Sequence, residues 1–501
     1  MTGEPRGGSD ERRTPRPSAV GTGRAAVPRA GVRPGWRAPA VMVLAGAAGA
    51  GVRVWQLAGR DPLIWTDTAD FHASSAAPWT SLELWAGARA AGAPALLKLV
   101  GGDDGGYVLW QAVVAVVCWA VLATSVFTVT GRRLRWPAAL AVLAFSVTAP
   151  VTMWERSVLS ESLALSLLAL VVAAGLQLAC RPSWPRAVGL LGALALWSIT
   201  RDSNAVVAAA GGTAVVLYAA VSWVRARHRS SAGEPRRRDP VVALGVGSLV
   251  LAAAVGWAAS HGDRHAFPMR NVYEVRVLPY PDRVQWFADH GMPQADQFTG
   301  PGARAPYREE GLPPVVYVAD DDATLGEWLD WVESDGRAAF ARYVATHPTY
   351  LVTEPLRSPE RVFNNARGDR GFYAPLDQRE VPLVDDVLAL PTSVALVAAF
   401  VAGGWALGRR RWSPALAVGA VTVALAVPHG VVAWHSDGME TARHLVVPAL
   451  QLHLGALLMV LGLGSPRTTQ VGDDGVGPAT PVDVYDAPAR VPSSPWPTTP
   501  R

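Results

Sequence analysis

Apolar residues in this 501-residue chain gather in long blocks that carry almost no charge. Each block is roughly 18–24 residues long, the length at which a helix crosses the hydrocarbon core of a bilayer. A soluble protein of similar composition would spread its apolar residues with the period of helices or strands. We therefore predict an all-α polytopic membrane protein with about ten transmembrane helices. The predicted spans are 38–57, 107–130, 136–153, 159–180, 187–200, 204–224, 241–260, 387–407, 414–434 and 443–463.

The connectors between these blocks alternate in charge. Arginine-rich connectors lie at 131–135, 181–186, 225–238 and 408–411, whereas the intervening ones are short and mixed in charge. Because positively charged loops stay in the cytoplasm, this alternation places both termini on the cytoplasmic side of the cell membrane. Arg53 lies close enough to the outer end of the first span that we expect it to snorkel toward the headgroups.

The segments at the two ends of the chain are too polar to fold on their own. Residues 1–37 are rich in Arg, Pro, Gly and Ser, and residues 464–501 in Pro, Thr and Asp. Such composition cannot bury enough apolar surface. It predicts a disordered basic cytoplasmic arm before the spans and a disordered cytoplasmic tail after them. The spans between these two segments fall into two groups, spans 1–7 (38–260) and spans 8–10 (387–463).

Two longer polar segments fall on the external side in this topology. In the first external loop, 59–106, the stretch 81–99 has helical apolar spacing that is broken near Pro94, which predicts interfacial helices. Residues 261–386 are enough for a small domain. Helical period over 325–345 predicts that this external domain is mostly helical.

Composition adds little to this picture. A net charge of +4 gives no reason to expect a nucleic-acid partner. The two cysteines, Cys118 and Cys180, fall in apolar blocks and have no spacing typical of a disulfide framework or a metal site. The sequence neither requires a divalent metal nor rules one out.

Ionisable residues gather at the predicted external ends of the spans. Charges at the rim of a membrane are costly, so they usually form pairs or carry function. A guanidinium can hold two phosphate oxygens at once, and a carboxylate can accept the proton of an attacking hydroxyl. The residues that the topology places there are Asp67, Asp70, Glu155, Arg156, Glu161, Arg201, Asp202, Asp437, Glu440, Arg443 and His444. This set favours an enzyme that acts on a lipid-linked substrate.

Three strings, in this order, resemble the GT-C class of membrane glycosyltransferases, especially protein O-mannosyltransferases and aminoarabinose transferases. Asp67-Thr-Ala-Asp70 lies where that class has its catalytic acidic residue, and residues 155–166 resemble the entry to its fourth span. The string Glu440-Thr-Ala-Arg443-His444-Leu-Val-Val-Pro448 resembles a Glu/Asp-x-x-Arg-Tyr-x-x-Pro pattern, with His444 in place of the usual Tyr. The resemblance covers roughly residues 38–463 and rests on arrangement more than on identity.

The resemblance implies a glycosyltransferase that moves a sugar from a polyprenyl-phosphate donor to an acceptor at the external face. Asp67 would be the catalytic base, and Arg201 and Arg443 would hold the donor phosphate. The other predicted substrate-binding residues are Asp70, Glu155, Arg156, Glu161, Asp202, Glu440 and His444. The partners would be the lipid-linked donor, membrane lipid and an acceptor that the sequence does not identify, with no other cofactor.

Simpler interpretations of the same residues stay open. Asp67 or Asp70 could cap a helix that begins near Phe71. Glu155 with Arg156, or Arg201 with Asp202, could be ion pairs that fix helix packing. The chain could instead be a transporter or flippase for a lipid-linked or anionic solute, or a non-catalytic membrane protein of envelope assembly.

Overall fold

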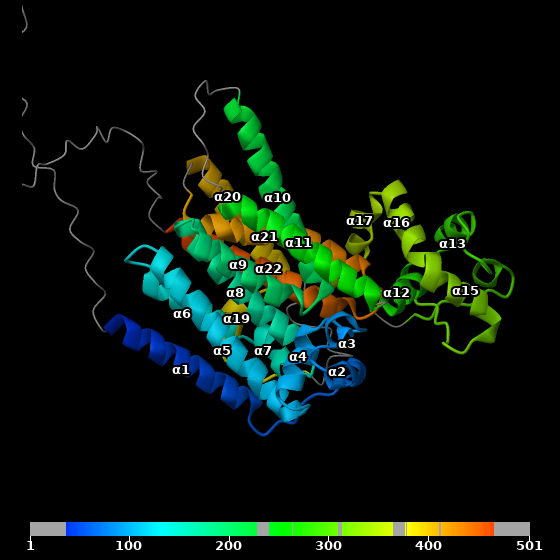
Figure 1. Ribbon diagram of the computed structural model, residues 1–501, viewed down its shortest axis with the longest axis horizontal. Coiled ribbons are helices and arrows are strands. Elements are labelled where there is room, and N and C mark those ends of the chain that lie inside the picture. The colour runs from blue at the N-terminus through cyan, green and yellow to red at the C-terminus, as the bar shows by residue number, and fades with distance from the viewer. Residues whose placement is uncertain are drawn as a thin grey trace, which may run out of the picture. The chain divides into compact units, whose positions relative to one another are not determined.

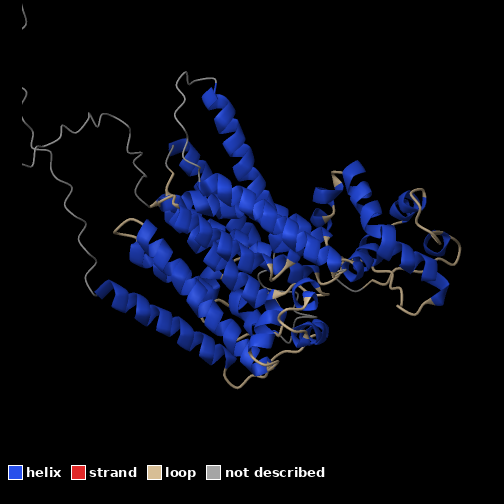
Figure 2. Cartoon of the chain, in the orientation of Figure 1, coloured by secondary structure: helices blue, strands red, loops and turns tan. Residues whose placement is uncertain are grey.

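The computed structural model describes residues 37–227, 240–262, 264–308, 313–363, 376, 378–409 and 412–464. The predicted arm up to residue 36, the tail from residue 465 and the connector 228–239 lie outside these residues. The described residues form helices and contain no β-strand, only two isolated bridges (Figure 2). The prediction of an all-α chain is therefore confirmed for this part of the protein.

Eight of the described helices are long and apolar enough to cross a membrane, which makes the chain a multi-pass membrane protein. They are α1 (Arg37–Leu57), α5 (Asp104–Val129), α8 (Glu161–Cys180), α10 (Asp202–Arg227), α11 (Pro240–His261), α20 (Thr392–Arg409), α21 (Pro414–His435) and α22 (Thr441–Leu463), seen in Figure 1. A ninth span is formed if α6 (Arg135–Ser146), α7 (Ala149–Thr152) and η1 (Met153–Arg156) count as one helix bent by 54°. The predicted span at 187–200 is α9 (Trp184–Ser198), whose 15 residues fall short of the usual length.

Helix α22 is the most enclosed of the candidate spans and packs against α8, α20 and α21. Its contact with α21 is close because two glycines face each other. A Cβ atom on Gly419 would lie 2.7 Å from the carbonyl oxygen of Gly455, and one on Gly455 would lie 2.9 Å from that of Gly419. Small residues let helix backbones approach in this way inside a membrane. The second half of α22 is thereby held directly against α21.

The break between α6 and α7 has a cause in the sequence. Pro150 has no N–H group to bond the carbonyl of Ser146, four residues earlier. Arg53 of α1 donates to that carbonyl instead, at 2.6 Å, and also pairs with Glu155. Arg53 is 2% exposed, so the expectation that it snorkels to the headgroups is wrong. The guanidinium supplies one hydrogen bond that the interrupted helix lacks.

The first predicted external loop forms three short helices, α2 (Thr66–Ala76), α3 (Leu82–Ala86) and α4 (Gly92–Leu99). The chain bends between α3 and α4, not at Pro94, which lies in the first turn of α4 where its missing N–H is harmless. Because α2 begins at Thr66, neither Asp67 nor Asp70 is its N-cap, and the capping interpretation is wrong. Asp67 lies in the first turn, where the helix dipole favours negative charge.

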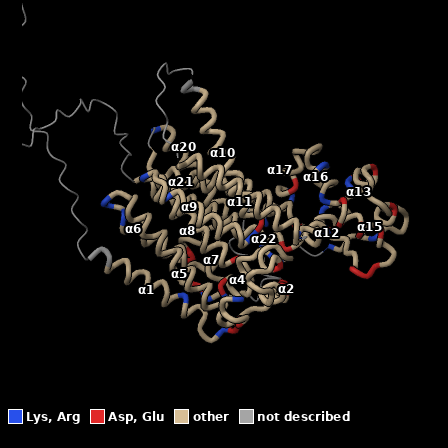
Figure 3. Tube along the Cα trace, in the orientation of Figure 1, with Lys and Arg blue, Asp and Glu red and all other residues tan. Residues whose placement is uncertain are grey.

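The polar segment between α11 and α20 builds helices around an apolar core of its own. Tyr273, Phe287 and Trp328 are fully buried in it, and the Tyr273 hydroxyl donates to the carbonyl of Gly336 at 2.9 Å. Charged residues are frequent in this segment and rare along the spans (Figure 3). Its elements are α12 (Ala266–Arg276), α13 (Pro281–Ala288), α14 (Asp296–Thr299), η2 (Ala323–Leu325), α15 (Gly326–Trp331), the π turn η3 (Val332–Gly336), α16 (Arg337–Thr346), α17 (Tyr350–Thr353), η4 (Pro355–Arg357) and α18 (Pro359–Phe363), followed by α19 (Val384–Leu388).

Candidate active site

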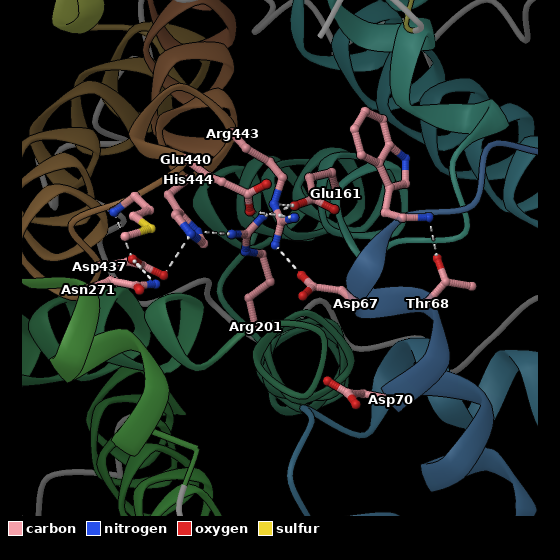
Figure 4. Close-up of polar contacts among 12 residues, drawn as sticks. Asp67, Thr68, Asp70, Glu161, Arg201, Asn271, Asp437, Glu440, Arg443 and His444 are labelled. Atoms are coloured by element: carbon pink, nitrogen blue, oxygen red, sulfur yellow. Dashed lines mark hydrogen bonds and ion pairs between the residues drawn. The ribbon is translucent and has the colours of Figure 1, made fainter. Parts of the chain in front are cut away.

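Arg443, in the first turn of α22, is bound by three carboxylates from different parts of the chain (Figure 4). Its Nη2 lies 2.5 Å from Oδ2 of Asp67, its Nη1 lies 2.7 Å from Oε2 of Glu440, and its Nε lies 3.0 Å from Oε1 of Glu161. Asp67 comes from α2, Glu161 begins α8, and Glu440 directly precedes α22. One guanidinium thus joins the first predicted external loop to two spans.

A second arginine shares one of these carboxylates. Arg201, between α9 and α10, donates from Nη1 to Oε1 of Glu161 at 2.9 Å. Its Nη2 lies 2.7 Å from Nδ1 of His444 (Figure 4). Glu161 is 1% exposed, so two guanidinium groups surround a carboxylate that water barely reaches. The arrangement compensates for the cost of burying that charge.

Arg89, in the bend between α3 and α4, is a third arginine of the site and was missed by the sequence analysis. Its Nη2 lies 2.9 Å from Oδ1 of Asp67 and 2.5 Å from Oδ2 of Asp70. Asp67 therefore carries one arginine on each of its oxygens. No motif marks Arg89, and only its place in the same predicted loop as Asp67 and Asp70 could have suggested the contact.

Five carboxylates, Asp67, Asp70, Glu161, Asp437 and Glu440, lie among these three arginines and His444. Burial by itself would raise the pKa of Asp67, but Arg443 and Arg89 outweigh it and hold that pKa below its ordinary value. Burial raises the pKa of Glu440, an effect that Arg443 only partly offsets. Asp67 is therefore ionised at neutral pH, and Glu440 takes up a proton more readily than an ordinary glutamate does.

Three of the predicted site residues have other partners. Glu155 pairs with Arg53, and both side chains are 2% exposed. Asp202 pairs with Arg264, which precedes α12, at 2.9 Å. The main-chain carbonyl of Arg156 accepts a hydrogen bond from the main-chain N–H of Leu63 at 2.8 Å. The Asp202 and Glu155 contacts join segments that are distant in sequence, and so fasten the fold around the cluster.

The cluster can bind an anion or act on a proton only if its partners change. Each oxygen of Asp67 bonds an arginine, so the carboxylate is a weak base in this arrangement. Removing one arginine would raise its basicity. Arg89 is the more exposed of the two, with 31% of its side chain accessible against 9% for Arg443. Within the described residues, no three His, Cys, Asp or Glu side chains are grouped as metal ligands.

Comparison with known proteins assigns no family to the chain. No protein-family model matches it. No characterised protein matches its sequence. The resemblance to GT-C glycosyltransferases therefore stays a prediction from sequence.

Proposed function

We propose that this protein is a membrane glycosyltransferase that transfers a sugar from a polyprenyl-phosphate donor to an acceptor at the external membrane face. The observation that carries the proposal is the contact between Asp67 and Arg443, which are 376 residues apart. This contact joins Asp67, the proposed base in the predicted first loop, to Arg443, the residue proposed to bind the donor phosphate at the end of a span. The sequence resemblance names the same two residues for the same two roles.

In the proposed reaction, the acceptor hydroxyl attacks the anomeric carbon of the donor sugar. Asp67 accepts the hydroxyl proton as the new carbon–oxygen bond forms. The bond between the anomeric carbon and the phosphate oxygen breaks, and polyprenyl phosphate leaves with the bonding electrons. Arg201 and Arg443 stabilise the negative charge that grows on the leaving phosphate.

Binding of the donor would also change the basicity of Asp67. A phosphate competes with carboxylates for guanidinium groups, because it offers several strong acceptor oxygens. If Arg89 moves from Asp67 to the phosphate, the carboxylate loses one of the two contacts that lower its pKa. The base would then become active only when the donor is in place.

We propose ten spans: the eight long helices, the bent helix of α6, α7 and η1, and α9, which is too short to be recognised as a span by its length alone. Helix α9 starts four residues after the end of α8, beside the arginine-rich connector 181–186. It ends near Arg201, whose partner Glu161 begins α8, and Trp197 donates to the carbonyl of Ala164 at 3.0 Å. From the end of α8, the chain therefore runs back beside α8 to the level of its first residue, and α9 with the few residues after it spans that distance. Ten spans keep both termini cytoplasmic and the Arg443 cluster external.

The test is sugar transfer by purified protein from a panel of labelled polyprenyl-phosphate sugars, in the presence of lipid and candidate acceptors. We expect Asp67→Asn to lower the transfer rate by about 10²–10⁴-fold, the usual contribution of a general base. Asp61→Asn is the matched control, since Asp61 is an exposed acid of the same loop. Transfer by Asp67→Asn at the wild-type rate would refute the role of Asp67.

One observation favours a second candidate, a non-catalytic membrane protein of envelope assembly. All six predicted site carboxylates, Asp67, Asp70, Glu155, Glu161, Asp202 and Glu440, have an arginine partner. Complete pairing is what a purely structural network would show. A protein that is folded, binds no polyprenyl phosphate and transfers no sugar would support this candidate over the enzyme.

A further inference from the structure

The imidazole of His444 lies between a guanidinium and a carboxylate. Its Nδ1 is 2.7 Å from Nη2 of Arg201, and its Nε2 is 3.3 Å from Oδ2 of Asp437. Arginine can only donate hydrogen bonds, so Nδ1 must be the acceptor. With Nδ1 as the acceptor, the ring proton is on Nε2, the nitrogen that lies 3.3 Å from Oδ2 of Asp437. His444 thus serves as a hydrogen-bond acceptor for Arg201.

Asp437 is held in turn by α12, the first helix of the α12–α18 segment. Nδ2 of Asn271 donates to Oδ1 of Asp437 at 3.0 Å (Figure 4). The main-chain N–H of Met439 donates to the same oxygen at 2.9 Å. Arg276 donates to the main-chain carbonyl of Asp437 at 3.2 Å. Asn271 is 5% exposed and Arg276 is 3% exposed. Two buried side chains of α12 therefore fix the short connector between α21 and α22.

The backbone of this connector lies directly against α12. A Cβ atom on Gly438 would come within 2.1 Å of the carbonyl oxygen of Asn271. Two residues later, Glu440 adopts a left-handed conformation with φ of 47°, which is unusual for a residue with a side chain. The contact with α12 and the entry to α22 together determine where Asp437, Arg443 and His444 lie.

We propose that Asn271 and Asp437 are positioning residues that act through His444 on Arg201, and so set the affinity of the site for the donor phosphate. This inference rests on the proposed function. Arg201 has two partners in the cluster, Glu161 and His444. If His444 turns away, only Glu161 still holds Arg201, and the Nη2 end of the guanidinium loses the contact that orients it for a phosphate. The α12–α18 segment would thereby tune donor binding without touching the donor.

Binding of polyprenyl phosphate to the purified full-length protein tests this inference, because it requires no transfer. We expect Asn271→Ala to weaken binding about tenfold, comparable to the loss of one hydrogen bond to a charged group. Asp437→Asn keeps the size of the side chain and should weaken binding to a similar extent. Gln297→Ala is the control, since Gln297 bonds the carbonyl of Thr324 in the same segment and has no role in the connector.

A double-mutant cycle separates this route from a general loss of structure. In a His444→Ala background, Asn271→Ala should cause no further loss of affinity, because the residue through which it acts is already gone. In the transfer reaction, Asn271→Ala should raise KM for the donor about tenfold and change kcat less than about twofold.

Losses of affinity that add in the double variant, or unchanged binding by Asn271→Ala and Asp437→Asn, would overturn the inference. So would a wild-type protein that does not bind polyprenyl phosphate. If the wild type binds polyprenyl phosphate but transfers no sugar, and the cycle still shows coupling, the proposed function fails and the positioning role stands.

Discussion

Two buried arginines, Arg53 and Arg443, differ in how their charge is matched. Arg53 pairs with one carboxylate, Glu155, and donates to one carbonyl, and both side chains of the pair are 2% exposed. Arg443 is bound by three carboxylates, of which Asp67 is 19% and Glu440 31% exposed. Glu161 is shared with Arg201, and Asp67 with Arg89.

This difference means that Arg53 stabilises the fold through one fixed ion pair, whereas Arg443 can exchange one carboxylate partner for another. At the break of α6, Arg53 donates to the one carbonyl of Ser146, and burial closes the pair with Glu155 to other groups from solvent. Around Arg443 the carboxylates outnumber the arginines, so the contacts compete and can be redistributed. An incoming phosphate would enter this competition, whereas it could not reach the Arg53 pair.

The largest effect on stability should come from Arg53→Met, which leaves Glu155 charged without its partner and the Ser146 carbonyl unsatisfied. Breaking a buried pair in this way usually costs about 3–5 kcal/mol. Thermal unfolding of the purified protein should show a large drop in Tm, and Arg53→Met with Glu155→Met should recover part of it. The exposed Arg132→Met serves as control. A wild-type Tm for Arg53→Met would show that this pair is as exchangeable as the Arg443 cluster.

A comparison of Arg443→Gln with Arg89→Gln should show a gradation inside the site. Both variants remove an arginine from Asp67, but Arg443 is the more buried and holds two further carboxylates. Charged hydrogen bonds contribute about 1.5–3 kcal/mol each, and exposed ones less. We expect Arg443→Gln to weaken binding of polyprenyl phosphate about 100-fold and Arg89→Gln about tenfold or less. Equal effects would mean that exposure does not decide which partner yields.

The smallest effects should appear in the pH dependence of stability. The pKa of Asp67 lies below its ordinary value of 3.8, so the stability it contributes is complete above that pH and lost as the pH falls through its folded value. The pKa of Glu440 lies above 4.5, so its contribution is present below that pH and lost as the pH rises through its folded value. Asp67→Asn should therefore lose less stability than wild type on acidification below about pH 4. Glu440→Gln should lose less on a rise above about pH 4.5.

These two variants can be compared by chemical or thermal unfolding over a pH series, with the wild type measured beside them. Slopes that change in the same direction for Asp67→Asn and Glu440→Gln would contradict the opposite pKa shifts. Such a result would also mean that the pKa values of Asp67 and Glu440, which both pair with Arg443, do not shift in opposite directions.

The sequence predicted much of the helical framework, because the length of an apolar block directly determines whether it can span a bilayer. It also brought Asp67, Glu161, Arg201, Glu440, Arg443 and His444 into one candidate set, since each follows or precedes a span on the same predicted side. The sequence contains Pro150, but it did not predict the break after α6. The break depends on Arg53 of α1, which donates to the carbonyl that the proline leaves without its helical partner. Helix α9 was predicted as a span, and its 15 residues show that length alone does not settle that assignment.

Apolar block length, arginine distribution and the order of the charged strings were determined by the sequence itself, since each depends on neighbouring residues or on a count along the chain. The choice of partners was decided only by the tertiary structure. Arg89 meets Asp67, Glu155 meets Arg53, and Asp202 meets Arg264 because the packing of the helices fixes which charged ends face each other. A buried charge must find a partner, but the sequence specifies only that need. The geometry of the packed helices determines which residue meets it.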